Sequence, residues 1–166
     1  LTGSHFVKVP GDVAPETRRY YQQLTRFSAA FAFLSDLSMG TMGGALKRKE
    51  KLSARLGDIL SLMYLATATL KRYESEGRHS ADAPLMHWAI WDCMFRIQQA
   101  FEGVIANFPS KHFAFVLRRV VVFPLGRPYV VPSDKLGHQV ADRGRHACNL
   151  SALREGQTLP QAYPTK

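Results

Sequence analysis

Residues 43–75 read GGALKRKEKLSARLGDILSLMYLATATLKRYES and contain the signals that decide the fold. Two glycines interrupt a helical pattern, a dense cluster of cations follows them, and a long amphipathic helix begins there. Apolar residues then recur at three- and four-residue steps, which is the spacing of one buried helix face. We expect a helix from about Leu46 to Ser75, closed by Gly77. Its buried stripe is predicted to be Leu52, Leu56, Ile59, Leu60, Met63, Ala66, Leu70 and Tyr73.

A second long helix is predicted upstream, beginning near Pro15 to Thr17. We expect it to be interrupted at Met39–Gly44, because each glycine costs about 1 kcal/mol of helix propensity and consecutive glycines permit a sharp bend. Its buried face is predicted to be Tyr20, Leu24, Phe27, Phe31, Leu34 and Leu37.

A third long helix is predicted downstream, with Ser80 or Asp82 as its N-cap and Pro84 in its first turn, where a missing N–H costs nothing. Pro109 is expected to end it. Its buried stripe is predicted to be Leu85, Trp88, Phe95, Ile97, Phe101, Val104, Ile105 and Phe108.

The remaining sequence is less regular. Residues 110–122 are compatible with a helix or an extended segment, and we expect a helix. A loop rich in proline and glycine follows, then a short helix capped by Ser133 or Asp134 and running to about Arg143. These features predict an all-α fold, a bundle of three long helices plus shorter ones with an irregular C-terminal part. We divide the chain into an extended lead-in (1–15), a helical domain (16–143) and a loose tail (144–166).

Composition limits the possible functions. The chain has 166 residues and is 46% hydrophobic, enough for one domain with a packed core. No apolar run reaches the roughly 18–20 residues that span a bilayer. The net charge of +9 fits either a solvated basic surface, which is the simpler interpretation, or an acidic partner. Cys93 and Cys148 are too few and too far apart for a disulfide framework or a zinc site, and they suit a reducing cytoplasm. Because the chain starts at Leu1 rather than at methionine, we interpret it as a piece of a longer protein.

The sequence lacks the motifs of several kinds of active site. No glutamate is followed by histidine at the Glu-x-x-His spacing of a di-iron bundle, and no nucleotide-binding glycine loop occurs. His87 is expected to be a packed or surface residue rather than a metal ligand. We therefore predict no catalytic, cofactor-binding or metal-binding residue in this segment.

The best candidate for a functional site is a cation cluster at the start of the predicted Leu46–Ser75 helix. Cations at a helix N-terminus are unfavourable by about 0.3–1 kcal/mol each, so an acidic neighbour is expected. That neighbour could be an acidic protein face, anionic lipid headgroups or the phosphates of coenzyme A. Alternatively, the cluster is solvated, or the preceding helix runs through the glycines and ends favourably among these charges. The cluster consists of Lys47, Arg48, Lys49, Lys51 and Arg55.

Two aromatic residues, Phe33 and Trp91, fall outside the predicted buried stripes. Side chains of this kind can dock against another domain, so we regard both as candidate contacts with a partner.

Several separated stretches, in one order, resemble the helical C-terminal extension of the long bacterial acyl-CoA dehydrogenases, flavoproteins of fatty-acid β-oxidation. The resemblance covers roughly residues 19–141. The matching stretches are Arg19–Leu37, Gly43–Asp58, Tyr64–Tyr73, Glu76–Arg78, Pro84–Trp88, Asn107–Pro109, Phe123–Tyr129 and Pro132–His138.

This resemblance implies a parent enzyme that uses FAD to oxidise long-chain acyl-CoA to trans-2-enoyl-CoA. It places the catalytic glutamate and the flavin-binding surfaces in a core upstream of this segment, which would itself be inactive. It further implies packing on that core, a homodimeric parent, and a cytoplasmic location with peripheral contact at the inner membrane. Charge and shape alone leave an alternative, a free-standing basic adaptor that binds nucleic acid or an anionic surface; few stacking aromatics accompany the cations, so nucleic acid is the less favoured partner.

Overall fold

The computed structural model describes residues 11, 13–44, 48–108, 115 and 128–154, except the side chains of 145–154. All regular structure in these residues is helical, so the predicted all-α class is confirmed. The chain divides into two compact units, Leu1–Val131 and Pro132–Lys166. The first contains α1 (Pro15–Met42), α3 (Glu50–Ser75) and α4 (Ala83–Ala106), and the second contains α6 (Asp134–Arg154).

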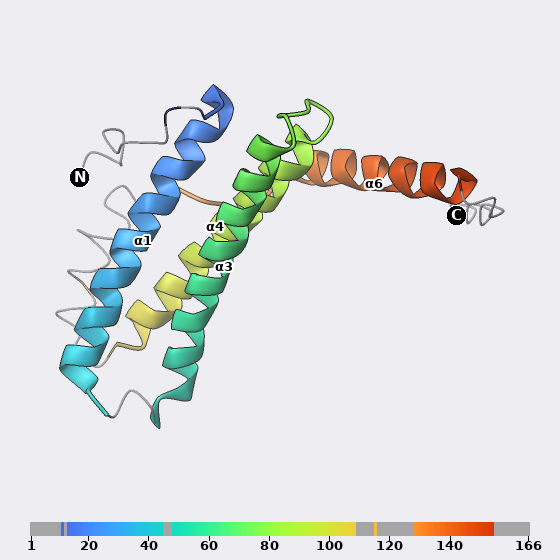
Figure 1. Ribbon diagram of the computed structural model, residues 1–166. Coiled ribbons are helices and arrows are strands. Elements are labelled where there is room, and N and C mark those ends of the chain that lie inside the picture. The colour runs from blue at the N-terminus through green and yellow to red at the C-terminus, as the bar shows by residue number, and fades with distance from the viewer. Residues whose placement is uncertain (1–10, 12, 45–47, 109–114, 116–127, 155–166) are drawn as a thin grey trace, which may run out of the picture. The chain divides into compact units, whose positions relative to one another are not determined.

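The three long helices of the first unit lie side by side and alternate in direction (Figure 1). A tight turn joins α3 to α4. Gly77 adopts a φ of 93° there, which favours glycine, and the Arg78 N–H donates to the Tyr73 carbonyl at 3.1 Å. Because this turn reverses the chain within a few residues, α4 folds back along α3.

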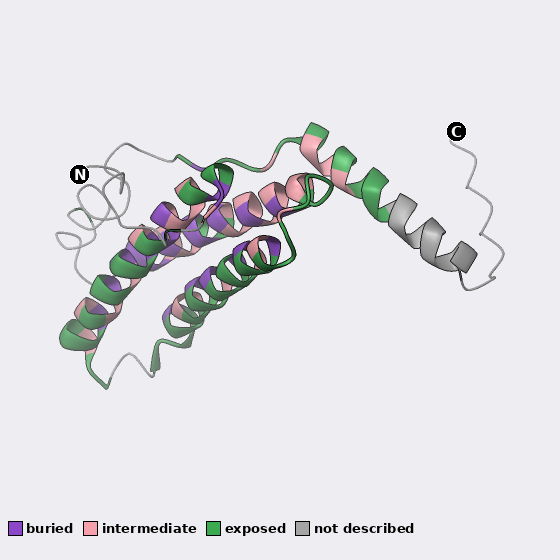
Figure 2. Cartoon of the chain, turned by 45° about the horizontal axis from the view of Figure 1, so that its top comes forward, coloured by how far each residue is buried: buried purple, intermediate pink, exposed green. Residues whose placement is uncertain are grey.

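The core is formed by the facing sides of α1, α3 and α4, where the buried residues concentrate (Figure 2). Eight side chains, drawn from all three helices, are fully buried and apolar and are among the largest in the core. They are Leu34, Ile59, Leu70, Ile90, Met94, Ile97, Phe101 and Val104.

The predicted stripe of α1 is confirmed. Leu24, Phe27 and Leu34 are buried, and the other three predicted residues pack against them. The helix ends at Met42, inside the interruption predicted at Met39–Gly44. It passes Gly40, since a single glycine costs only about 1 kcal/mol, and its C-cap is Gly43, whose φ is 49°.

Helix α3 ends at Ser75 as predicted, but it begins at Glu50 rather than at Leu46. Six residues of its predicted stripe are buried and Leu56 is half-buried. Leu60 was placed wrongly, since 56% of it is exposed. It lies one residue after the buried Ile59, and a step of one residue turns a side chain by about 100° around a helix axis.

Helix α4 begins after Asp82, as expected, although the Asp82 side chain makes no capping hydrogen bond. Ile97 and the four predicted stripe residues after it are buried, and Trp88 and Phe95 are half-buried. Leu85 was placed wrongly, since it is 51% exposed while Met86 and Ile90 are buried. The prediction chose the bulky residues Leu85 and Trp88 at the start of the helix, whereas the buried face there begins at Met86. The actual stripe is Met86, Ile90, Met94, Ile97, Phe101, Val104 and Ile105.

Helix α6 begins at Asp134, where a cap was predicted, and the Ser133 carbonyl accepts the N–H groups of Leu136 and Gly137. It extends to Arg154, well past the predicted end near Arg143. One glycine at position 144 has open space around it and does not terminate the helix. The helix expected over 110–122 lies outside the described residues, apart from Phe115.

Candidate functional site

The predicted cation cluster lies around the start of α3. Arg48 and Lys49 precede the helix, Lys51 lies in its first turn, and all three are exposed. Glu50 places a negative charge at the positive end of the helix and offsets part of the repulsion. Lys47 lies outside the described residues. Since α1 ends at Met42, these cations do not sit at the C-terminus of a continued first helix.

Arg55 does not share the exposed setting of its predicted partners. Its side chain is half-buried and lies against Gly103 of α4. A β-carbon at Gly103 would lie 2.9 Å from Arg55 Nε and 3.0 Å from Cδ, so the glycine lets the arginine cross the interface. Arg55 therefore packs between α3 and α4, and the exposed cluster is confined to the residues around the helix start.

A group of hydrogen bonds ties the beginning of α1 to the end of α3. Glu74 accepts the Ala14 N–H at 3.1 Å and the Thr17 hydroxyl with one carboxylate oxygen, and the Arg78 guanidinium with the other. Burial raises the pKa of Glu74, but these hydrogen bonds lower it, and its net pKa lies below the ordinary value. The charged form of Glu74 is thus the one that joins the two helices.

A second bond reinforces this junction. The Tyr73 hydroxyl donates to Glu16 Oε1 at 2.6 Å. This hydrogen bond, together with burial, raises the pKa of Tyr73 to about 12. Two of the carboxylates at this end of the bundle, Glu16 and Glu74, are therefore engaged in holding helices together.

Tyr129 fills the space between α1 and α4. Its ring lies 5.6 Å from that of Phe27 and 5.7 Å from that of Trp91. The buried Gln98 amide accepts the Tyr129 N–H and donates to its carbonyl, both at 3.1 Å. Burial raises the pKa of Tyr129 to about 12, although nearby Arg26 lowers it in part. Side chains from two helices thus fix one short segment of chain by its ring and its backbone.

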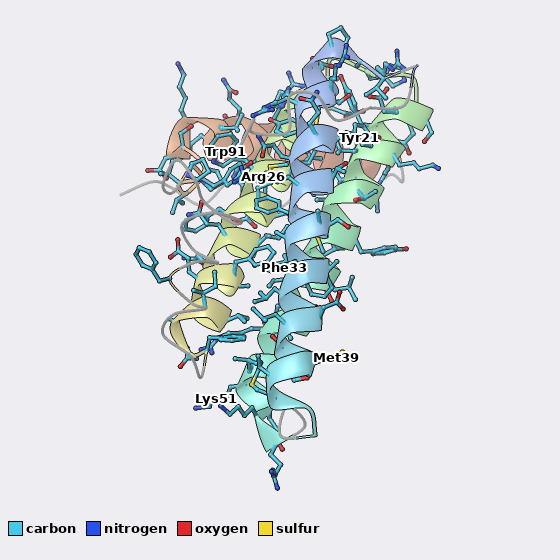
Figure 3. All side chains as sticks on the ribbon, turned by 90° about the vertical axis from the view of Figure 1, so that its left-hand side faces the viewer. Tyr21, Arg26, Phe33, Met39, Lys51 and Trp91 are labelled. Carbon is cyan, nitrogen blue, oxygen red and sulfur yellow. The ribbon has the colours of Figure 1, made fainter. Side chains whose placement is uncertain are left out.

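Trp91 contributes to the same anchor. Its indole N–H donates to the Val130 carbonyl at 2.7 Å, so its polar group is satisfied within the chain. Figure 3 shows Trp91 and Arg26 on one side of α1, while Tyr21 lies on the side next to α3. Of the two aromatic residues proposed as partner contacts, Phe33 remains 49% exposed and Trp91 is engaged internally.

His87 is a packed residue, as expected. Its Nδ1 lies 2.8 Å from the Tyr20 hydroxyl, and the two rings meet with centroids 5.6 Å apart. Within the described ranges, no group of three histidine, cysteine, aspartate or glutamate side chains could hold a metal ion. No helix in the same ranges is long and apolar enough to cross a membrane.

The surface of the first unit carries three described hollows, which differ in charge. One, of about 350 Å³ near the α3–α4 turn, is lined by Arg72, Glu76 and Asp82 among others. Another, of about 500 Å³, lies between α3 and α4 and includes Arg55 and Arg96. Both contain ionisable side chains of each sign.

The third hollow, which we call the α1–α3 groove, has a volume of about 440 Å³ and no charged side chain among its described lining residues. They are Tyr21, Leu24, Thr25 and Ser28 of α1 with Leu60, Met63, Tyr64 and Thr67 of α3. This groove was not predicted from the sequence. The available signal was the absence of any charged residue from Ile59 to Leu70.

Comparison with known proteins identifies the family. The family model of the bacterial-type C-terminal domain of acyl-CoA dehydrogenases matches residues 1–162, further in both directions than the stretches found from the sequence. No solved structure matches the chain. The enzymes that carry such a domain are flavoproteins. Because the match spans nearly the whole sequence, this chain belongs to the family of bacterial-type acyl-CoA dehydrogenase C-terminal domains.

Proposed function

We propose that this domain is the structural and interaction module of an FAD-dependent acyl-CoA dehydrogenase that oxidises long-chain acyl-CoA to trans-2-enoyl-CoA in fatty-acid β-oxidation. The catalytic glutamate and the flavin belong to the core that precedes the domain in the same polypeptide. The domain packs on that core and helps to shape a homodimer. Its exposed cations at the start of α3 meet an acidic face of the core or anionic lipid at the inner membrane.

The observation that carries this proposal is that ionisable side chains between the helices are engaged in hydrogen bonds within the domain. Glu16 and Glu74, which could act as acid–base groups in another setting, are hydrogen-bonded between α1 and α3. His87 pairs with Tyr20. General acid–base catalysis needs a group that reaches a substrate proton, and these groups reach other helices instead. Together with the family match, this supports a role in assembly rather than in the redox step.

The proposal is tested by separating the domain from its enzyme. We expect the purified 166-residue chain to bind no FAD and to leave palmitoyl-CoA unoxidised. The full polypeptide should bind FAD and oxidise palmitoyl-CoA. A stoichiometric yellow flavin complex of the chain alone would overturn the proposal. Absorbance near the flavin bands and a dye-reduction assay provide the two measurements.

The cation cluster is tested by replacing Lys47, Arg48, Lys49 and Lys51 with glutamine. We expect weaker docking to the core or weaker binding to anionic vesicles, since removing positive charge reduces attraction to an acidic surface. Unchanged behaviour in both assays would show that the cluster is only solvated surface. High salt should reproduce the effect on the unmodified chain, because exposed charges are screened.

A further inference from the structure

We propose that the α1–α3 groove is the surface on which the catalytic core packs, and that the core fills it with a helix bearing an uncharged stripe. This inference rests on the proposed function and adds the face and the chemistry of the contact.

The exposed surface around the groove is unusual for a chain with a net charge of +9. No charged residue occurs from Phe27 to Ser35 in α1 or from Ile59 to Leu70 in α3. Helices on a protein surface normally carry charged side chains on the outer face, and those that lack them all round are buried in a larger assembly. The α3 run contains all four groove residues of that helix. On α1, three lining residues, Tyr21, Leu24 and Thr25, lie in the short uncharged stretch before Arg26, and Ser28 lies in the run that follows it.

Two large side chains project at the groove without a described apolar cover. Tyr64 is 74% exposed and Leu60 is 56% exposed. Burying each of them against a partner would contribute about 25 cal/mol per Å² of apolar area. Tyrosine in particular offers a large ring with a hydroxyl at its edge, which is why it is enriched at interfaces.

The rest of the lining suits a helix. Thr25 and Ser28 of α1 and Thr67 of α3 are small, and all three are exposed. The Thr25 hydroxyl donates to the Tyr21 carbonyl at 2.9 Å, and the Thr67 hydroxyl donates to the Met63 carbonyl at 2.8 Å. Because both hydroxyl donors are already satisfied, covering these side chains with a partner leaves neither donor without a hydrogen bond. Small side chains allow helix axes to approach within about 8–10 Å. The groove can therefore accept an apolar ridge from another helix.

The charge distribution favours the core over a second copy of this chain or a membrane. Two copies that each carry +9 repel one another, whereas the core is tethered to the domain and so has a high effective concentration. A helix that lies on lipid needs large apolar side chains on its inserted face. Five of the eight described lining residues carry a hydroxyl group, so the groove lacks a continuous face of large apolar side chains.

Covalent labelling of tyrosine, read by mass spectrometry, tests the proposal. We expect Tyr64 to react at least roughly tenfold more slowly in the full enzyme than in the isolated chain, because its ring is buried on docking. Limited proteolysis of the same full enzyme, followed by gel filtration, shows independently whether the domain stays attached to the core. Circular dichroism of the isolated chain checks that it is folded.

Two matched variants of the full enzyme identify the face. Tyr64→Glu introduces a charge in the groove, and Ser61→Glu introduces the same charge on the side of α3 that faces the charged hollow. Both positions are exposed, so neither change should destabilise the isolated domain by more than about 0.5 kcal/mol. We expect Tyr64→Glu alone to release the cleaved domain from the core.

The outcomes distinguish this inference from the proposed function. A domain that remains attached while Tyr64 reacts at the isolated rate overturns the choice of face only. Equal release by Tyr64→Glu and Ser61→Glu does the same. A domain that never associates with the core overturns the proposed function itself. Protection of Tyr64 in the isolated chain, by dimerisation at high concentration or by anionic vesicles, would assign the groove to a second copy or to lipid instead.

Discussion

Replacing Glu74 with glutamine should destabilise the domain by an amount that can be worked out from its three hydrogen bonds. Glutamine keeps one oxygen for the Ala14 N–H and the Thr17 hydroxyl, but it presents an NH₂ group to Arg78. A hydrogen bond to a charged group contributes about 1.5–3 kcal/mol, and charge-assisted bonds are about twice as strong as neutral ones. Arg78 is partly exposed and can turn to water, which limits the loss. We therefore expect a destabilisation of about 1.5–3 kcal/mol at pH 7, or roughly 3–10 °C in Tm.

The effect should depend on pH in a defined direction. The pKa of Glu74 is lowered in the folded state, so its carboxylate stabilises the fold above the ordinary carboxyl pKa of about 4.3. That contribution is lost as the pH falls through the folded-state pKa. The difference between the unmodified chain and Glu74→Gln should therefore be largest at pH 7, persist at pH 5, and shrink below about pH 4.

Urea denaturation followed by circular dichroism measures both effects. Glu76→Gln is the matched control, because Glu76 makes an exposed pair with Arg72 at 2.9 Å and such pairs contribute little. We expect the control to change the free energy of unfolding by less than about 0.5 kcal/mol. The reasoning is refuted if Glu76→Gln costs as much as Glu74→Gln, or if the cost of Glu74→Gln is the same at pH 7 and pH 3.

Three further predictions follow from the helices and their anchors. Gly57→Ala should stabilise the domain by about 1 kcal/mol, because Gly57 lies inside α3 with nothing within 4 Å of the position that the added methyl group would take; a lower urea midpoint would contradict this. Gln98→Leu should destabilise it by about 2–3 kcal/mol, because a buried backbone N–H and carbonyl lose their partners, and an unchanged midpoint would show that they are satisfied otherwise. Tyr73 and Tyr129 should ionise near pH 12, so ultraviolet titration should show at least two late phenols, and stability should fall between about pH 10 and pH 12; complete ionisation near pH 10 while the chain is still folded would exclude both shifts.

Local sequence signals predicted the helices better than their exact faces. Apolar periodicity identified three long helices because burial of one stripe dominates helix stability in a folded protein. The choice between Leu85 and Met86 failed, since adjacent apolar residues fit two stripes that differ by about 100°. Only packing against α3 decides between them.

The contacts that join distant residues could not be predicted. Glu74 bonds to a hydroxyl 57 positions away, and Gln98 bonds to a backbone 31 positions away, so neither pairing has a local spacing. The cation cluster was found by simple adjacency, a criterion that does not distinguish the exposed members from Arg55, which is half-buried against Gly103. The α1–α3 groove had a local signal in its lack of charge, but its position between two helices required the fold.

The amide of Gln98 holds Tyr129 in the way that one strand holds the next in a β-ladder, through one donor and one acceptor. Backbone groups are alike in every residue, so this amide would accept Pro128 poorly, for want of an N–H, but Val130 equally well. The register of the segment must then depend on the aromatic ring of Tyr129, which packs between Phe27 and Trp91. A slip that placed Val130 at this position would keep both Gln98 bonds and lose the packing of the ring. Tyr129 therefore sets the register of this segment against α1 and α4.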